Sequence, residues 1–462
     1  MKCVMSTRAV SARFDETNLI KYGGLVSIVR LAERCGLPGL AAGLLRWKDS
    51  ANSAGAAPVA KMLTLVFGMV AGADSIDDMD RLRHGAMTAA FAGMRAPSTL
   101  GSFLRAFTHG HVQQLAAVCR KVLPALAAHA PLLPGADGVA YVDIDDTIRR
   151  TYGYAKHGAG IGYSKVKGLN ALIACVSTPL ARPVIVAARL RRGATNSARG
   201  AASFVTEAVT TARSLGAAGP VVVRADSAFY SEEVVAAARK AGARFSVTVR
   251  MNPSIRAAIE QITDDGWTAI RYPNAVWDDD GQCWISDAEI ARVPYTAFVS
   301  KPRARRVAAS LIVRRVKRLG DGPVQGQGEL FTTYRFHAVF TDSPLSLVAA
   351  EKAHRAHAVV EQVIADLKGS ALAHFPSGRF NANAAWLHLA ALAYNLTRAA
   401  GALASSFHAR ATTGTIRADL IEVPARLATR GRRQIWHLPA YWHAEGDWLD
   451  LFAALHSPPV AA

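Results

Sequence analysis

The spacing of apolar residues predicts that the first part of the chain is helical. Apolar side chains recur every three or four positions in residues 25–31, 62–70 and 112–126, as on one face of an α-helix. Pro97 opens a further segment with an apolar face, and proline is favoured in the first turn of a helix. We therefore expect a helical N-terminal region over residues 1–135.

From residue 139 the pattern changes to short apolar runs separated by turns. These runs predict strands at residues 139–145, 168–177, 183–190, 221–225 and 244–249. Helical patterns at residues 198–215 and 231–241 separate the last three strands. Hairpin-linked strands followed by alternating helix and strand predict an α/β fold, with helices on both faces of a mixed sheet.

Residues 251–345 interrupt this alternation. They contain tryptophans and two β-prone runs, at 308–316 and 331–340, which predict a mainly β insertion. Residues 346–404 then return to long helical patterns, and the remaining residues are mixed. The expected organisation is a helical region (1–135), a core in two pieces (136–250 and 346–404), a β-rich insertion (251–345) and a C-terminal region (405–462).

The charge balance predicts a polyanionic partner. The formal net charge is +19, and basic residues gather at 301–306 and 314–318. Clustered cations can follow a phosphate backbone, so nucleic acid is favoured over an anionic membrane surface. The five cysteines form no CxxC pair, which fits a cytoplasmic protein. The apolar stretch 384–404 is interrupted by polar residues and predicts a buried helix, so we expect no membrane partner.

Two predicted strands end in carboxylates. Asp143, Asp145 and Asp146 follow the first apolar run, and Asp226 follows the run at 221–225. Ligand sites of open α/β sheets gather at the carboxyl ends of strands. Either group can instead be an acidic turn or cap that terminates its strand.

A third polar group lies on a predicted helix near residue 360. His354, His357, Glu361 and Lys368 are spaced by three, four and seven residues, which places them on one stripe. The alternative is an exposed polar face. Two strand aspartates and one helical glutamate can converge on two divalent ions, and carboxylates suit Mg²⁺ or Mn²⁺. Two such ions catalyse phosphodiester displacement.

These motifs resemble those of DDE transposases with an RNase H-like catalytic core. The chain resembles insertion-sequence transposases of the type 1380 group, relatives of the type 4 group. The matching segments are Asp143–Thr147 (DIDDT), Leu190–Asn196 (LRRGATN), Arg224–Tyr230 (RADSAFY) and the glutamate and lysine of the helix. The resemblance implies an RNase H-like five-stranded mixed sheet flanked by helices, with a β-rich insertion and an N-terminal helical domain.

The resemblance also implies the roles of individual residues. Asp145, Asp226 and Glu361 become the catalytic, metal-binding triad with two Mg²⁺ or Mn²⁺ ions, and Asp143 and Asp146 are rivals for the first position. His357 and Lys368 are expected to contact DNA phosphate, and Arg224 and Asn196 to bind DNA. One of Trp267, Trp277 and Trp284 stacks on a flipped base at a hairpin, or all three are core residues.

The implied activity is metal-dependent cleavage at terminal inverted repeats, followed by strand transfer into target DNA. The implied partner is double-stranded DNA, bound by a homodimer in the synaptic complex, and the implied location is the bacterial cytoplasm, at the nucleoid. Two other functions remain open: a metal-dependent nuclease on the same core, and an inactive DNA-binding relative. A zinc hydrolase is disfavoured because the fourteen histidines form no HExxH motif.

Overall fold

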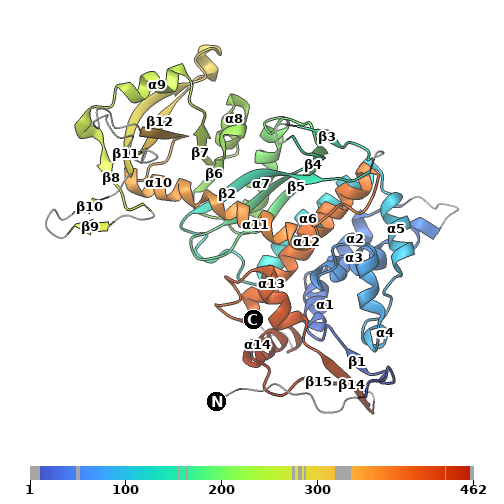
Figure 1. The fold of residues 1–462 in the computed structure, drawn as a ribbon. Coiled ribbons are helices and arrows are strands. Elements are labelled where there is room, and N and C mark those ends of the chain that lie inside the picture. The colour runs from blue at the N-terminus through green and yellow to red at the C-terminus, as the bar shows by residue number, and fades with distance from the viewer. Residues whose placement is uncertain are drawn as a thin grey trace, which may run out of the picture.

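The structure is a computed structural model, and it describes residues 11–47, 53–153, 156–162, 165–272, 276–278, 283–285, 288–317, 334–431 and 433–457. The N-terminal part is helical, as predicted (Figure 1). Its helices are α1 (Leu25–Arg34), α2 (Leu37–Leu44), α3 (Pro58–Val70), α4 (Met87–Ala90), α5 (Pro97–Arg105) and α6 (His109–His129). Helix α6 starts at Thr108, whose hydroxyl accepts a hydrogen bond from the His111 amide in a capping box.

The core of the fold is the predicted mixed sheet. Its strands are β2 (Ala140–Arg150), β4 (Lys167–Ser177), β5 (Val184–Arg192), β6 (Val221–Ala225) and β7 (Arg244–Val249). They lie side by side in the order β5-β4-β2-β6-β7; β4 is antiparallel to β2 and β5, and β6 is parallel to β2 and β7. This is the RNase H-like arrangement expected from the resemblance. The two-residue strand β3 (Gly160–Ile161) pairs with the start of β4.

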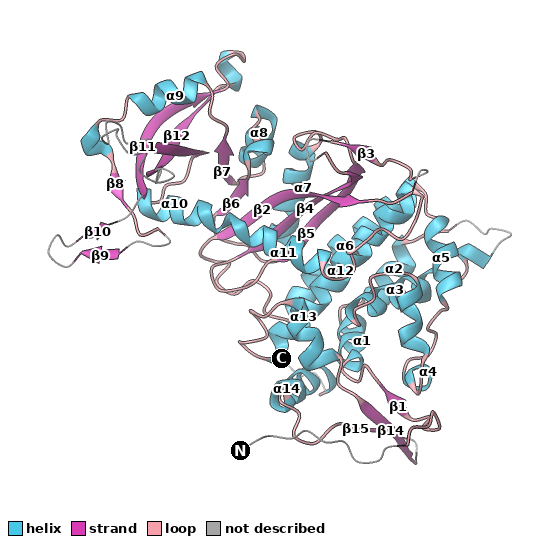
Figure 2. Cartoon of the chain, in the orientation of Figure 1, coloured by secondary structure: helices cyan, strands magenta, loops and turns pink. Residues whose placement is uncertain are grey.

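The insertion continues this sheet and does not form a separate one (Figure 2). Strand β13 (Tyr334–Thr341) pairs antiparallel with β7, and β12 (Val307–Lys317), β11 (Ala288–Ala297) and the short β8 (Thr268–Ala269) follow outward. Helix α9 (Pro253–Glu260) covers this part, and β9 (Val276–Asp278) pairs with β10 (Cys283–Ile285) as a separate hairpin. The β-rich character of the insertion agrees with the sequence.

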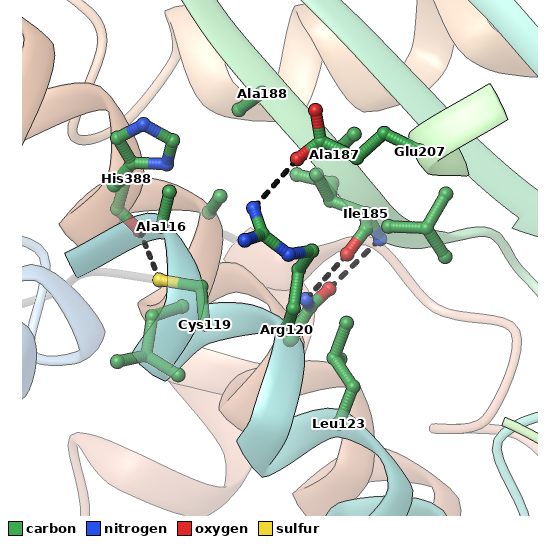
Figure 3. A pocket seen from close by; sticks show the side chains of 13 residues that line it. Ala116, Cys119, Arg120, Leu123, Ile185, Ala187, Ala188, Glu207 and His388 are labelled. Carbon is green, nitrogen blue, oxygen red and sulfur yellow. Dashed lines mark hydrogen bonds and ion pairs between the residues drawn. The ribbon is translucent and has the colours of Figure 1, made fainter. Parts of the chain in front are cut away.

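Helices α7 (Ala201–Ser214) and α8 (Glu232–Lys240) follow β5 and β6. On β5, the long helix α12 (Phe380–Ala404) is packed beside α6. Figure 3 shows the small cavity between them, where Arg120 of α6 pairs with Glu207 of α7 at 2.7 Å. The side-chain oxygen of Asn395 on α12 accepts a hydrogen bond from the Ile185 amide at 2.9 Å, and its side-chain nitrogen donates one to the Ile185 carbonyl at 2.8 Å. A helix side chain thus completes the hydrogen bonds of the outer strand β5.

Helix α12 contains the apolar stretch 384–404 and is buried along most of its length, as predicted. Its one arginine, Arg398, is buried and donates to the carbonyl oxygens of Ala409 and Ala411. Among the helices of the described residues, none combines the length and the apolar character needed to cross a bilayer.

The C-terminal region packs on α12 and on α1. It comprises α13 (Thr413–Ile416), a π-helical turn at Arg417–Ile421, the strands β14 (Ala425–Arg430) and β15 (Arg433–His437), and α14 (Glu445–His456). Strand β14 also pairs with β1 (Leu19–Ile20) from the N-terminus. The buried His408 ring lies 3.1 Å from an Asp419 oxygen and 3.0 Å from an Asp447 oxygen. The region therefore forms part of the helical body of the protein.

Candidate active site

Asp145 and Asp226 lie at the point where the parallel pairing of β2 and β6 ends. The last paired residues are Ile144 of β2 and Ala225 of β6, and each is followed by an aspartate. Strand β2 does not end there: it continues to Arg150, paired only with β4. The sequence prediction that Asp145 ends its strand was therefore wrong, but β6 does end before Asp226, and the gap leaves both carboxylates beside each other.

Burial and mutual repulsion disfavour the charged forms of these two carboxylates. Burial, with the neighbouring charge of Asp226, raises the pKa of Asp145 to about 7. Burial, with the neighbouring charge of Asp146, also raises the pKa of Asp226. The Asp226 carboxylate accepts a hydrogen bond from the Ala228 amide at 2.9 Å, which fixes its direction at the start of a short helical turn. A pair of this kind is stabilised by an added cation.

Asp143 is held in a buried ion pair. Its two oxygens accept hydrogen bonds from Arg224 Nε at 2.6 Å and Arg224 Nη2 at 2.7 Å. Arg224 also stacks over the Tyr141 ring at 4.0 Å and donates to the Ala353 carbonyl. The arginine and its neighbours hold the pKa of Asp143 below its usual range, against the effect of burial.

Two sequence expectations change with this ion pair. Arg224 is only 2% exposed and its guanidinium is committed to Asp143, so the expected contact between Arg224 and DNA does not fit the structure. Arg224 instead positions Asp143. Asp143 in turn has no free oxygen lone pair directed to solvent, because it is fully buried, which weakens its claim to be the first metal ligand.

Asp146, the other rival, is also paired. It accepts hydrogen bonds from Arg191 of β5 and from the Asn170 amide nitrogen of β4, the latter at 3.0 Å. Arg191 is buried and is bonded to Asn170 Oδ1 at 2.9 Å as well. Within the described residues no ion pair involves Asp145. Of the three carboxylates on β2, Asp145 is thus the one without an ion-pair partner among the described residues.

The two histidines near residue 360 face the sheet. The ring of His354 lies 2.8 Å from Ser246 Oγ and 2.9 Å from Thr248 Oγ1, and burial lowers its pKa to about 3. His357 Nδ1 lies 2.8 Å from Asp143 Oδ1, and its charge acts on both Asp145 and Asp226. Asp143 thus orients His357 beside the two carboxylates.

The expected stripe of four polar residues does not lie on one continuous helix. Helix α10 (Leu347–Arg355) ends after His354, a 3₁₀ turn spans Ala356–Ala358, and α11 (Val359–Lys368) begins beyond it. A 3₁₀ turn advances fewer residues per turn than an α-helix, so the stripe bends there, although His354, His357 and Glu361 still line one cavity. His354 therefore points at the sheet, whereas Glu361 is exposed.

Glu361 lies at the edge of a cavity that His357 also lines. The cavity separates the turn at Ala356–Ala358 from strands β12 and β13, and Arg314 and Arg355 lie on its wall. No group of three acidic, histidine or cysteine side chains stands close enough to hold a metal in the part of the chain that the structure describes. Glu361 is thus near His357 but is not gathered with Asp145 and Asp226.

Lys368 approaches the carboxylates from the end of α11. Burial and the nearby Arg149 lower the pKa of Lys368, and the charge of Asp145 opposes that effect. Lys368 therefore lies close enough to Arg149 and to Asp145 for their charges to interact. These cations are suited to hold a phosphate next to the acidic pair.

An open polar groove begins next to Asp226. Its walls are the 194–198 loop, the turn after Asp226, and the polar residues Arg250 and Asn252. The Asn196 side-chain oxygen accepts from the Ala198 amide at 2.9 Å, so the amide nitrogen of Asn196 is left for another partner. The structure thus brings Asn196, expected from the sequence to bind DNA, to the same groove as the residues after Asp226.

Of the three tryptophans in the insertion, only Trp267 has a side chain that the structure describes. Arg315 lies over the Trp267 ring at 4.2 Å and over the Tyr334 ring at 4.6 Å, beside an open cavity. Trp277 and Trp284 belong to β9 and β10, where they are paired in register, but their side chains lie outside the described residues. Trp267 is half-buried, so its exposed edge is the part open to a ligand.

Sequence reasoning missed the partnership of Arg191 and Asn170 with Asp146. Asn170 is a buried polar residue within an apolar run, and Arg191 is a buried residue of the LRRGATN segment, which is a signal because such residues need a partner. The identity of the partner, however, depends on the register between β2, β4 and β5. That register is set by the folded sheet and could not be read from the spacing.

A solved structure of the piggyBac transposase synaptic complex with hairpin DNA resembles this chain with a TM-score of 0.41 and 10% sequence identity, over 95% of this chain and 83% of that one. Among curated proteins, none matches the sequence. The family model described as transposase DDE domain group 1 matches residues 2–458. The chain therefore belongs to the DDE transposase family.

Proposed function

We propose that this DNA transposase cuts DNA at the terminal inverted repeats of a bacterial insertion sequence and joins the freed ends to target DNA. The observation that carries the proposal is the pairing of Asp145 and Asp226 where β2 and β6 part. Both are carboxylates with raised pKa values and neither has an arginine partner among the described residues. Such a pair lacks a positive charge that a divalent cation supplies.

The proposed metal ligands are Asp145, Asp226 and Glu361. Carboxylate oxygens are the donors that Mg²⁺ and Mn²⁺ prefer, so the residues present fit the ions. Two bound ions would activate the attacking oxygen and stabilise the leaving oxygen of the phosphodiester. Glu361 is exposed on the first turn of α11, so its side chain has the freedom to turn toward the aspartates when DNA and cations bind.

The other residues of the site would hold the DNA strand. Lys368 lies near Asp145, and we propose that it neutralises the phosphate on one side of the cut. His357, oriented by Asp143, lies near both aspartates, and we propose that it contacts the phosphate as well. Asn196 and Arg250 line the groove that leads away from Asp226, where the strand continues.

We propose that the protein acts as a homodimer in the synaptic complex, because the family that its sequence resembles pairs the two ends of the insertion sequence before cutting. The solved piggyBac transposase structure is a synaptic complex with hairpin DNA. We propose the same class of partner, double-stranded DNA, for this chain, and its net charge of +19 is consistent with it. If the reaction uses a DNA hairpin, the insertion is where an aromatic residue would stack on a flipped base, and Trp267 is the described residue for that role.

The test is a cleavage and strand-transfer assay on a plasmid that carries the inverted repeats flanking the gene for this protein. The wild type is compared with Asp226→Asn and Glu361→Gln, with Mg²⁺ or Mn²⁺. The control is Glu233→Gln, an exposed carboxylate on α8 that faces none of the proposed ligands. Excision and joining should require the metal and should fall more than about a hundredfold in both site variants, since even outer-shell changes cost up to that much.

The control variant should keep wild-type activity. Cutting without joining would favour the nuclease interpretation. Tight DNA binding without cutting under either metal would mean that this chain is an inactive DNA-binding relative, and the catalytic proposal would be withdrawn.

A further inference from the structure

The C-terminal hairpin of β14 and β15 presents one cationic face to solvent. The register pairs Arg426 with His437, and Arg430 with Arg433. Residues at every second position of a strand share a face, as do directly paired residues of neighbouring strands. Arg426, Arg430, Arg433 and His437 therefore lie on one face, and all four are exposed.

The opposite face of the hairpin is held against the protein. Leu427 is buried, Trp436 packs edge-on against Phe91 at 5.8 Å, and β1 pairs with β14 on its other side. The hairpin is thus anchored by its inner face, and its outer face is free of the helical body. Figure 1 shows it at the end of the molecule opposite the β-rich insertion.

The cations of this face lack acidic partners. Within the described residues, no hydrogen bond or ion pair involves the side chain of Arg426, Arg430 or Arg433. Like charges placed directly opposite each other across two strands destabilise a hairpin, so the pair Arg430 and Arg433 costs stability in the free protein. An arrangement that costs stability without a partner points to an anionic ligand that removes the repulsion.

We infer that this face, the Arg426–Arg430–Arg433 hairpin, binds the sugar–phosphate backbone of duplex DNA. A two-stranded β-ribbon is of a size that the major groove of B-DNA admits, and arginine is suited to phosphate because its donors form a rigid fork. The inference rests on the proposed function, which supplies DNA as the partner. Because the hairpin lies in a different part of the molecule from strands β2 and β6, one duplex that reaches both runs along the surface of the protein (Figure 1).

The test is DNA binding without chemistry, measured by fluorescence anisotropy in a buffer with a chelator. One labelled duplex carries the terminal inverted repeat that flanks the gene, and the other has the same composition in scrambled order. The variant Arg426→Ala/Arg430→Ala/Arg433→Ala should bind both more weakly. The slope of log Kd against log salt should become less steep by about 3, from three lost phosphate contacts at about 0.9 each.

Two comparisons separate this effect from unfolding and from net charge. The variant Arg433→Glu turns the repulsive pair into an attractive one, so its melting temperature should stay equal or rise while its DNA binding weakens. The variant Arg30→Ala/Arg239→Ala/Lys240→Ala also removes three positive charges, but Arg30 already pairs with Glu33 at 3.2 Å, and Arg239 and Lys240 lie on α8. It should bind DNA almost as the wild type does.

Wild-type affinity and salt slope in the hairpin variant would overturn the inference. That result would leave the proposed function intact, because cutting is tested separately by Asp226→Asn, which should still bind DNA. If the wild type binds neither duplex, both the hairpin inference and the proposed function are wrong.

Discussion

Asp145 and Asp226 follow the last paired residues of two parallel strands, Ile144 and Ala225, and so lie side by side. Each strand supplies one carboxylate, and burial, together with the neighbouring charge of Asp226, raises the pKa of Asp145 to about 7. The arrangement is costly in the free protein at neutral pH. It becomes favourable once positive charge arrives, which is the relation that a metal site exploits.

The stability of the metal-free protein should therefore fall as pH rises. The pKa of Asp145 is raised from 3.8 to about 7 on folding, so the folded state retains a proton that the unfolded state has lost. This contribution is present below about pH 4 and disappears as pH rises through 7. The variant Asp145→Asn should be more stable than the wild type at pH 8, by a few kcal/mol at about 1.4 kcal/mol per unit of pKa shift, and should melt at a higher temperature. At pH 4 the two proteins should melt at the same temperature.

Thermal denaturation with a chelator measures this. A lower melting temperature for Asp145→Asn at pH 8 would contradict the repulsion argument, and a difference that persists at pH 4 would show that packing and not charge is responsible.

Breaking the Asp143–Arg224 ion pair should lower the free energy of unfolding of the protein. Removing one partner of a buried pair leaves an unpaired charge, which costs about 3–5 kcal/mol. The variant Arg224→Ala should therefore lose about that much in chemical denaturation. Arg224→Lys should not restore it, because lysine cannot offer the two-pronged contact to Asp143. Arg239→Ala, exposed on α8, is the control and should stay near wild type; a tolerated Arg224→Ala would mean the pair is not structural.

His354 should make the folded protein sensitive to acid. Burial holds its pKa at about 3, against 6.5 for an unfolded histidine, so the folded ring stays neutral when the unfolded one is protonated. Its stabilising contribution is present above pH 6.5 and is lost as pH falls toward 3. The variant His354→Asn should have a less steep decline in unfolding free energy between pH 6.5 and 4. An equal decline in both proteins would show that His354 does not drive it.

Variants of Glu361 and Glu351 should distinguish a loss of DNA cutting from a loss of stability. Glu361 is exposed, whereas Glu351 is buried and pairs with Arg314 at 2.7 Å and Arg355 at 3.4 Å. We predict that Glu361→Gln abolishes cutting but changes the melting temperature little, and that Glu351→Gln lowers the melting temperature because it leaves two arginines without their partner. A Glu361→Gln protein that is equally destabilised would weaken the functional assignment of Glu361.

The sheet was predictable because its strands are continuous apolar runs. Strands β6 and β7 begin and end where the sequence predicted, since turn residues and charges bound them. Strand β2 runs five residues further than predicted, to Arg150, because β4 pairs with its polar end, Asp146 to Arg150, which no hydrophobic pattern marks. The partner strand, and not the sequence of β2, sets its end.

The site was predictable in its acids but not in their neighbours. The aspartates follow apolar runs, so their spacing is visible in the sequence. The helix containing His354 and Glu361 is interrupted at Ala356–Ala358, although no glycine or proline marks the break. The contacts of His354 with Ser246 and of His357 with Asp143 accompany the break, and these depend on packing in three dimensions.

The contact of Asn395 with Ile185 has a consequence for association between copies of the chain. An unpaired strand at the edge of a sheet can pair with the same strand of another molecule and seed aggregation. On this side of the sheet the amide of Asn395 occupies the hydrogen-bonding groups of Ile185. On the other side β8 pairs with Glu289 and Ile290 of β11, and α9 packs against the same strand. The protein thereby limits edge-to-edge pairing while it is at high concentration and without DNA.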